Sequence, residues 1–437
     1  MKSRSILRYH GLLNRPKEYL ILPYQEEEVM FVSSANGRLR ELEELVLSLY
    51  IIDREYPEEN ALTLQVSEIK IWAELKKTIQ NLFSFLTDRY LDLKFERSQR
   101  LRSLQTALLD SSADFSRKPT VTCLFSGGLD STAGILNLQH REEPLLHHTI
   151  TGKIIKGKVV DLHSSPPLNK HGLALTDSQL KNIRPGISLL RGLLFLTNAS
   201  IIAYAFGQNA VVMPENGPLM INPQVSLLSP RPTRTAHPFL VKSVEQVLRR
   251  LIEKRFKIEC IFKEKTKAEV LASVMRETDL INKTYSCFTV QGQKRMCGIC
   301  YACFVRRVSA LCIDYQELDK LYSMDPFRVD IGSLGPKSVQ KINILRDSLS
   351  FFQNVLSDDK FVDQAIDNIP TGFFSDPHDL LRRFAADLFL GTRNYLKRAD
   401  AKLLNAFGKF AAEIISNEID SDILIQRREQ LLRQTRT

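Results

Sequence analysis

The strongest constraint on the fold of this chain is a pair of adjacent glycines between a predicted strand and a predicted helix. Residues 120–125 form a compact apolar run, the letters SGGLDS follow at residues 126–131, and a helix is expected to begin at Ser131. Two adjacent glycines let the backbone turn tightly with its N–H groups pointing into one concavity, and the positive end of the next helix adds to the attraction for an anion. The segment predicts a strand–loop–helix unit that can hold phosphate oxygens.

The predicted phosphate cradle comprises Phe125, Ser126, Gly127, Gly128, Leu129, Asp130, Ser131 and Thr132. It matches neither the Walker pattern nor the Rossmann fingerprint. A carboxylate would repel a bare phosphate, so Asp130 indicates either a bound Mg²⁺ or a role in positioning the loop.

Short apolar runs alternate with helical patterns after the cradle. Residues 145–151 and 210–213 are predicted strands, residues 189–206 are a predicted long helix, and residues 166–185 are expected to be a loop. This alternation predicts an α/β fold in which a parallel sheet is covered by helices on both faces.

The length of 437 residues predicts two or three domains. We expect a small α+β accessory domain over residues 1–118, the cradle-bearing domain over 119–320 and a helical region over 321–437, with a linker at 110–118. In the last region, Ser375 or Asp376 is expected to cap a helix that has Pro377 in its first turn. A helically spaced stripe, which we read as core or a docking face, comprises Tyr395, Ala399, Leu403, Phe407, Phe410 and Ile414.

Four of the seven cysteines lie close together and predict a metal site. They are Cys287, Cys297, Cys300 and Cys303. Four thiolates leave no open position, so we expect a structural zinc ion, with an iron–sulfur cluster as the alternative. An odd cysteine count with this clustering fits a reduced compartment, and no apolar run long enough to cross a membrane is visible, so we expect a cytoplasmic protein. Cys123, Cys260 and Cys312 are interpreted as ordinary thiols of the interior.

The net charge of +10 belongs entirely to the middle of the chain. Residues 119–320 hold 26 Lys and Arg against 16 Asp and Glu, whereas the segments on either side are each neutral. Such a surplus attracts anionic ligands or simply keeps a surface soluble, and the count alone does not choose between them.

Together these motifs resemble a known family. SGGLDS resembles the PP-loop of the N-type ATP pyrophosphatases. A Thr-Lys-Ala-Glu segment at residues 266–269, followed by TYSC at 284–287 and CGICYAC at 297–303, resembles the 7-cyano-7-deazaguanine synthases, the QueC-like branch. The resemblance implies the PP-loop (adenine nucleotide alpha hydrolase-like) fold, ATP with Mg²⁺, a structural Zn²⁺, and adenylation of 7-carboxy-7-deazaguanine with release of pyrophosphate.

The chain also departs from that pattern. It lacks the G-Y-P-D-C-R-like segment, and it carries an N-terminal region with residues 52–54 and 85–89 that looks like that of QueC-like proteins of antiphage defence islands, particularly the QatC type; a second candidate is the QueC-like component of cyclic-oligonucleotide defence systems. Such relatives imply that the activated carboxylate is joined to an amine of a partner protein and that the reaction stops at the amide.

Several polar residues are candidates for this chemistry. Lys267 and Arg191 are predicted to stabilise charge at the α-phosphorus, together with Asp130 in the loop. The predicted substrate contacts are Glu215 and Asn216, facing the guanine-like edge, and Arg234 and His237.

Three other functions stay open at this stage. The chain could make the nitrile from ammonia, it could be a nucleotide-binding scaffold of a defence complex, or it could modify tRNA. Thiolation of tRNA normally needs a catalytic cysteine outside the zinc set, and Cys123 lies inside a predicted strand, so we do not expect RNA as a partner; nor do we expect a membrane.

Overall fold

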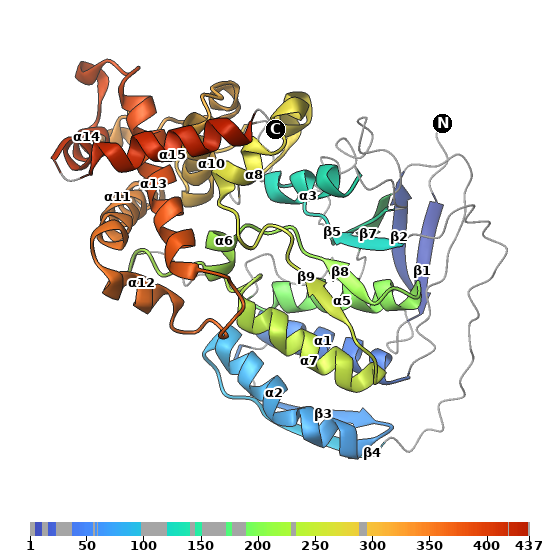
Figure 1. Cartoon of the computed structure of the whole chain (residues 1–437). Helices are drawn as coiled ribbons and strands as arrows, with labels where there is room; N and C mark the ends of the chain where they lie inside the picture. Colours follow the sequence, from blue (N-terminus) through green and yellow to red (C-terminus); the bar gives the residue numbers. More distant parts are fainter. Residues whose placement is uncertain are drawn as a thin grey trace. The chain divides into compact units, whose positions relative to one another are not determined.

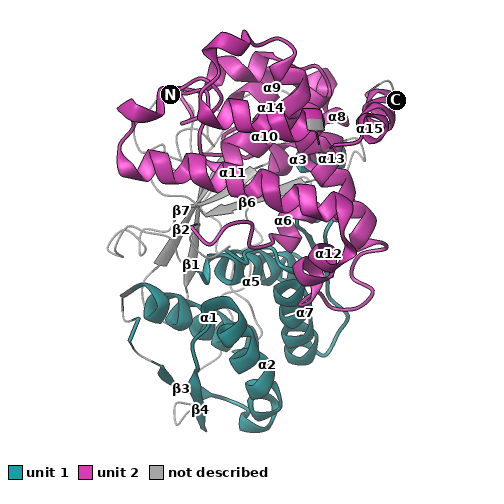
Figure 2. Ribbon diagram, turned by 90° about the vertical axis from the view of Figure 1, so that its left-hand side faces the viewer, with its two compact units in different colours: residues 1–126, 134–214, 233–261 teal, residues 127–133, 215–232, 262–437 magenta. Residues whose placement is uncertain are grey.

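The chain folds into two compact units, each built from segments that are separated in the sequence (Figure 2). The computed structural model describes residues 5–10, 16–22, 37–55, 57–58, 60–97, 120–139, 145–150, 172–176, 189–228, 233–287, 295–417 and 419–435. The first unit comprises residues 1–126, 134–214 and 233–261, and the second comprises residues 127–133, 215–232 and 262–437. The predicted domain limits at 118 and 320 stay a prediction.

The first unit is organised around a seven-stranded sheet (Figure 1). In spatial order its strands are β1 (Ser5–His10), β2 (Pro16–Leu22), β7 (Gly172–Thr176), β6 (Leu145–Ile150), β5 (Val121–Leu124), β8 (Ala210–Val212) and β9 (Lys257–Glu259). The five strands from β7 to β9 are parallel, and β1 and β2 add an antiparallel hairpin beside β7. The prediction of an α/β fold with a parallel sheet is therefore confirmed.

Strand β7 corrects one expectation. We expected residues 166–185 to be a loop, but Gly172–Thr176 is a strand that pairs with β6 on one side and β2 on the other. The strand is only five residues long and shows no alternation of apolar and polar residues, so its partners rather than its own pattern define it.

Helices of the first unit pack on this sheet and on one another. Helix α5 (Arg191–Ala205) packs against β5, β6 and β8, and α1 (Gly37–Glu55) and α7 (Pro238–Ile252) pack against α5. A separate two-stranded parallel sheet, β3 (Ala61–Val66) and β4 (Asp92–Arg97), is connected by α2 (Ile69–Thr87), which also packs on α7. The predicted helix at 189–206 and the predicted strands at 120–125, 145–151 and 210–213 are confirmed.

Among its described residues, the second unit is built from helices joined by irregular segments. Its helices are α6 (Gly217–Ile221), α8 (Lys267–Ala272), α9 (Thr278–Lys283), α10 (Tyr301–Cys312), α11 (Pro336–Ser357), α12 (Asp359–Ile366), α13 (Pro377–Leu396), α14 (Ala406–Asn417) and α15 (Ser421–Gln434). Helix α13 lies at the centre and packs against α10, α11, α14 and α15. Helices α13 and α10 approach each other closely at Gly391, where no side chain fits. A Cβ on this residue would lie 2.0 Å from the Val308 carbonyl oxygen. The predicted start of α13 is confirmed, since Asp376 caps it and Pro377 follows.

The apolar stripe at residues 395–414 is divided between α13, α14 and the segment that joins them, and does not lie on one helix as its spacing indicated. Helix α13 ends at Leu396 and α14 begins at Ala406. Asn405 interrupts the pattern: its Nδ2 donates to the Pro326 and Val329 carbonyls, and its Oδ1 accepts the Gly408 N–H. Phe407 is buried and stacks on Phe327, whereas Leu403 is 57% exposed. Among the described residues, no helix combines the length and the apolar character needed to cross a bilayer.

Candidate functional site

The predicted cradle has the strand–loop–helix form that the sequence indicated. Strand β5 ends at Leu124, and helix α3 (Leu129–Gln139) begins two residues after the glycine pair starts. Gly127 has a φ of +73°, in the left-handed region that favours glycine. Its carbonyl accepts the Tyr285 N–H at 3.0 Å, and the Gly128 carbonyl accepts both the Thr132 N–H and the Ser131 hydroxyl, each at 3.0 Å.

Asp130 is the centre of a buried polar cluster in the second unit. Its Oδ2 accepts hydrogen bonds from Lys267 Nζ at 2.5 Å and from Asn216 Nδ2 at 2.9 Å. The side chains of Asp130 and Lys267 are 9% and 7% exposed, so the ion pair lies out of bulk water. The structure therefore brings together three predicted site residues that lie far apart in the sequence.

Asn216 uses both ends of its side-chain amide. While Nδ2 donates to Asp130, Oδ1 accepts the Leu219 N–H at 3.2 Å and so caps α6. The residue is fully buried. Asn216 thus ties the loop to α6, and a substrate could reach its amide only by displacing one of these bonds.

Glu215 adds a second carboxyl beside Asp130. Burial raises the pKa of Glu215 well above its usual value, the neighbouring charge and hydrogen bond of Asp130 raise it further, and Lys267 opposes them. The Oδ1 atom of Asp130 is buried and accepts no hydrogen bond from the amides, hydroxyls and cationic groups of the described residues. A protonated Glu215 can supply the missing donor, and a divalent cation could replace that proton.

Lys267 owes its position to the start of α8. Thr266 caps this helix by accepting the Glu269 N–H at 3.3 Å, and the Glu269 carboxylate accepts the Thr266 N–H at 2.8 Å. This reciprocal capping box fixes the backbone on both sides of Lys267. The Thr-Lys-Ala-Glu segment therefore begins a helix whose first residue, Lys267, contacts Asp130 of the predicted phosphate cradle.

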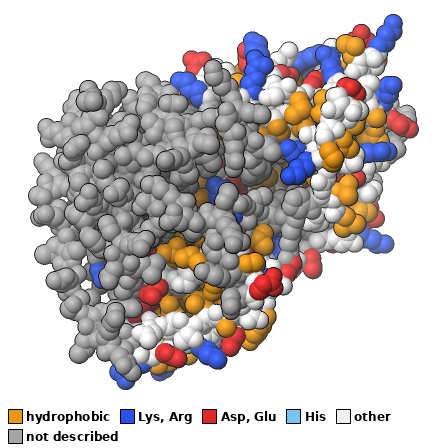
Figure 3. Space-filling model, turned by 180° about the vertical axis from the view of Figure 1, so that it is seen from behind, with side chains coloured by type: hydrophobic (Ala, Val, Ile, Leu, Met, Phe, Trp, Pro, Cys, Tyr) orange, Lys and Arg blue, Asp and Glu red, His pale blue; other side chains and the backbone are white. Residues whose placement is uncertain are grey.

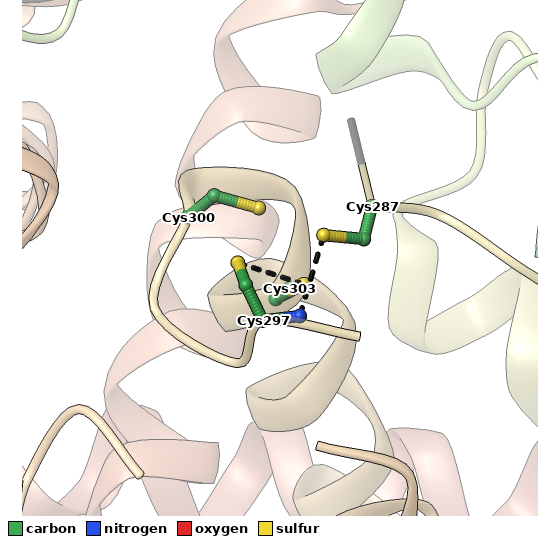
Figure 4. A group of neighbouring side chains, drawn as sticks. All are labelled: Cys287, Cys297, Cys300 and Cys303. Atoms are coloured by element: carbon green, nitrogen blue, oxygen red, sulfur yellow. Dashed lines mark hydrogen bonds between the residues drawn. The ribbon is translucent and has the colours of Figure 1, made fainter. Parts of the chain in front are cut away.

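The four clustered cysteines form a candidate metal centre, which Figure 4 shows. Their sulfur atoms all lie within 4.8 Å of one another, and the Cys297 and Cys303 sulfurs are 3.9 Å apart. Zinc bound to thiolates at about 2.3 Å in a tetrahedron places its ligands about 3.8 Å apart. The donor set and its spacing are compatible with zinc.

The cysteine ligands come from two chain segments that converge. Cys287 follows α9, while Cys297, Cys300 and Cys303 belong to a knuckle that leads into α10 (Figure 4). Gly298, with a φ of +81°, makes the knuckle possible, because a Cβ there would lie 1.9 Å from the Met324 carbonyl oxygen.

Arg306 on α10 is a residue that the motifs did not single out. Its guanidinium is completely buried and donates to the Thr284 and Ile281 carbonyls, each at 3.0 Å, and to Ser286 Oγ at 3.3 Å. Burial lowers the pKa of Arg306. The side chain thereby holds the segment that carries both Tyr285, which contacts the loop, and Cys287. The sequence signal that could have indicated Arg306 is a charged residue within the largely apolar run that forms α10.

Arg191, Arg234 and His237 belong to the first unit, where each makes local contacts. The Arg191 guanidinium lies 4.8 Å from the Phe195 ring. Arg234 donates to the Phe85 carbonyl, and its guanidinium lies 4.2 Å from the Phe85 ring. His237 caps α7, since its Nδ1 accepts the Phe239 N–H at 3.1 Å. Burial, with the nearby Arg234 charge, lowers the pKa of His237 to about 4.

The excess positive charge of residues 119–320 is partly neutralised on the described surface. Arg250 pairs with Glu74 at 2.8 Å, and Arg249 pairs with Glu245 at 3.4 Å. On the described part of the face in Figure 3, basic side chains lie among acidic and apolar ones. The charge count therefore does not by itself identify an anion-binding surface.

Comparison with known families gives one finding for this chain. Residues 176–312 match the family model described as Queuosine biosynthesis protein QueC. This segment is QueC-like. It covers less than a third of the chain and includes Glu215, Asn216, Lys267 and the four clustered cysteines, while the phosphate loop lies before it. No curated protein matches the chain. The QueC-like match supports the PP-loop fold and an ATP-using enzyme, and leaves the QatC type undecided.

Proposed function

We propose that this chain uses ATP to adenylate the carboxylate of a 7-carboxy-7-deazaguanine-type molecule and transfers the acyl group to an amine. The products are an amide, AMP and pyrophosphate. The QatC-like features of the sequence further suggest that the amine belongs to a partner protein of an antiphage defence system.

The observation that carries this proposal is the ion pair between Asp130 and Lys267. It joins the PP-loop, which lies outside the QueC-like segment, to the Thr-Lys-Ala-Glu motif, which lies inside it. Two motifs of one family pattern thus meet in a buried cluster, as expected if both serve the same bound nucleotide.

The residues of the second unit can be given roles in this reaction. The backbone N–H groups of residues 127–131 would bind phosphate oxygens, and Lys267 would offset the negative charge that grows on the α-phosphate as the carboxylate attacks. Attack forms the acyl–phosphate bond and breaks the bond between the α-phosphorus and the bridging oxygen, so pyrophosphate leaves. The amine then attacks the acyl carbon, loses a proton, and expels AMP. Arg191, Arg234, Glu215 and His237 stay proposed contacts of the nucleotide or the deazapurine.

The residues present fit the two metal ions that the proposal needs. The carboxylates of Asp130 and Glu215 offer oxygen ligands suited to Mg²⁺, which would neutralise phosphate charge when bound. The four cysteines would hold Zn²⁺ and fix the segment that carries Tyr285 and Cys287.

Thiolation of RNA is a poorer fit to the described residues. Cys123 lies in β5, is completely inaccessible, and has a pKa raised by burial. A buried neutral thiol is a weak nucleophile.

The test is to incubate the protein with ATP, Mg²⁺ and 7-carboxy-7-deazaguanine, and to measure pyrophosphate release and the products by mass spectrometry. We expect pyrophosphate release that depends on the carboxylate, and an added deazaguanine acyl mass on a protein encoded beside this one. Lys267→Met should lower the rate of release by about 10²–10³-fold, because it removes a charge that stabilises the transition state, whereas Lys409→Met, which changes an exposed lysine on α14, should not lower it.

Each other outcome points to a different correction. A nitrile formed from ammonia would replace the amide reaction by nitrile synthesis. Pyrophosphate release without any deazapurine product would remove the substrate while keeping the phosphate loop. Binding of ATP without turnover under any of these conditions would refute the enzyme and favour a scaffold.

A further inference from the structure

Arg427, near the C-terminus, reaches the residues on either side of Lys267. This arginine lies on α15, and its side chain is 4% exposed. Its Nη2 donates to Thr266 Oγ1 at 3.1 Å, and its Nη1 forms an ion pair with Glu269 Oε1 at 2.8 Å. Thr266 and Glu269 are the two partners of the capping box that begins α8.

A second buried residue fixes the orientation of Arg427. Asp387 on α13 is completely buried and accepts two hydrogen bonds from Arg427, from Nε at 2.6 Å and from Nη2 at 3.1 Å. The two-pronged contact matches the planar guanidinium to the carboxylate. Asp387 raises the pKa of Arg427, and Arg427 opposes the rise that burial causes in the pKa of Asp387.

Arg383 completes the arrangement from α13. It donates to Glu269 Oε1 and, at 3.1 Å, to the Glu264 carbonyl. Two carboxylates, Glu269 and Asp387, thus face two guanidinium groups, so the cluster is close to neutral. Helix α8 has only six residues, and a helix this short has little stability of its own. Side chains from α13 and α15 therefore set where its first residue, Lys267, points.

We propose that Arg427 is a positioning residue, which acts through Thr266 and Glu269 to hold the Lys267 ammonium against Asp130. The helical C-terminal segment is then part of the candidate active site, although 160 residues separate Arg427 from Lys267 in the sequence. The catalytic consequence of this proposal rests on the proposed function, whereas its structural consequence does not.

The test compares Arg427→Lys with a matched control. A lysine keeps one charge but cannot bridge Asp387, Thr266 and Glu269 at once. The control is Arg428→Ala, because Arg428 is the next residue on α15 and pairs at the surface with Asp314 at 3.0 Å. Asp387→Asn serves as a second variant if Arg427→Lys fails to fold, and thermal unfolding shows which variants are folded.

Two measurements are made on each variant. The first is hydrogen exchange of the backbone amides of residues 266–273 without nucleotide, which we expect to become about tenfold faster in Arg427→Lys and to stay unchanged in Arg428→Ala. The second is pyrophosphate release, for which we expect a loss of about 100-fold in kcat in Arg427→Lys with a much smaller change in the KM for ATP. If Arg427 acts through Lys267, then Lys267→Met with Arg427→Lys should be no slower than Lys267→Met alone.

Three results would overturn the inference. They are unchanged exchange in Arg427→Lys, faster exchange with an unchanged kcat, and a double variant slower than Lys267→Met. If the wild-type protein releases no pyrophosphate, the proposed function fails, and hydrogen exchange alone decides whether Arg427 holds α8 in place.

Discussion

Removing the charge of Lys267 should destabilise the second unit strongly, because it leaves Asp130 with a buried charge. The two side chains are 7% and 9% exposed, and the ammonium lies 2.5 Å from the carboxylate. In Lys267→Met the methionine fills a similar volume, but Asp130 loses its hydrogen-bonded cation. It keeps the neutral Asn216 amide, the adjacent Glu215 carboxyl and the electrostatic attraction of the buried Arg306. Breaking one side of a buried ion pair costs about 3–5 kcal/mol, so we expect a loss of that size in the free energy of unfolding.

Neutralising Asp130 as well should restore the stability that Lys267→Met loses. In Lys267→Met with Asp130→Asn, the unpaired charge is gone, and the stability should return to within about 1 kcal/mol of the wild-type value, since neutral replacements of buried ion pairs are often tolerated. Urea unfolding followed by far-ultraviolet circular dichroism measures the stability of both variants, with Lys409→Met as the exposed control. Pyrophosphate release should stay as slow in the rescued variant as in Lys267→Met.

Two results would refute this reasoning. If Lys267→Met costs less than about 1 kcal/mol, the ion pair is not buried as described. If the double variant is as unstable as Lys267→Met, the loss comes from packing and not from the charge of Asp130.

Three further predictions concern zinc and pH. Cys300→Ser should lower the zinc content measured by atomic emission from about one ion per chain, and should reduce the helical signal, because folding of the knuckle is coupled to metal binding. The pKa of Glu215 is raised in the folded state, so stability is lost as the pH rises above the usual carboxyl value of 4.5, by at most about 1.4 kcal/mol per pH unit. Glu215→Gln should remove this loss, which urea titrations at pH 5 and pH 8 would measure. For His237, the lowered pKa means that stability is lost as pH falls from 6.5 to about 4, by at most about 3 kcal/mol; His237→Asn, which keeps a capping acceptor, should flatten this dependence.

The fold could be predicted where local patterns were strong. The apolar run before the glycines, the predicted helix that became α5, and the Asp376 cap all identified their elements, because each depends on neighbouring residues alone. Strand β7 was not predicted, because it is formed by pairing with β6 and β2 and not by a pattern in its own residues. The antiparallel hairpin of β1 and β2 beside β7 was not predicted either. The sequence of one strand does not identify which strands lie next to it in the sheet.

The candidate site shows the same division between local and distant information. The phosphate loop and the cysteine knuckle were visible because their residues lie close together in the sequence. The partner of Asp130 was not, since Lys267 lies 137 residues further along the chain. The family pattern assigned Asp130 and Lys267 to the same reaction. That they form an ion pair is seen only in the folded chain. No sequence pattern indicated a role for Arg427, because a single arginine on an amphipathic helix is typical of a surface residue.

The position of Asp130 resolves the apparent conflict of a carboxylate inside a phosphate-binding loop. A bare carboxylate there would repel the phosphates, but Lys267 and Asn216 both bind its Oδ2 and so offset most of its charge on one side. The other oxygen, Oδ1, is buried without a hydrogen-bond partner among the described residues, and a proton or a cation could be shared between the neighbouring carboxyls of Asp130 and Glu215. The charge of the loop therefore depends on where Lys267 points, and that direction is set by α8, Thr266 and Glu269. The helices that follow residue 320 consequently bear on the electrostatics of the loop, and a truncation that removes α15 should impair the phosphate site even though the loop itself is intact.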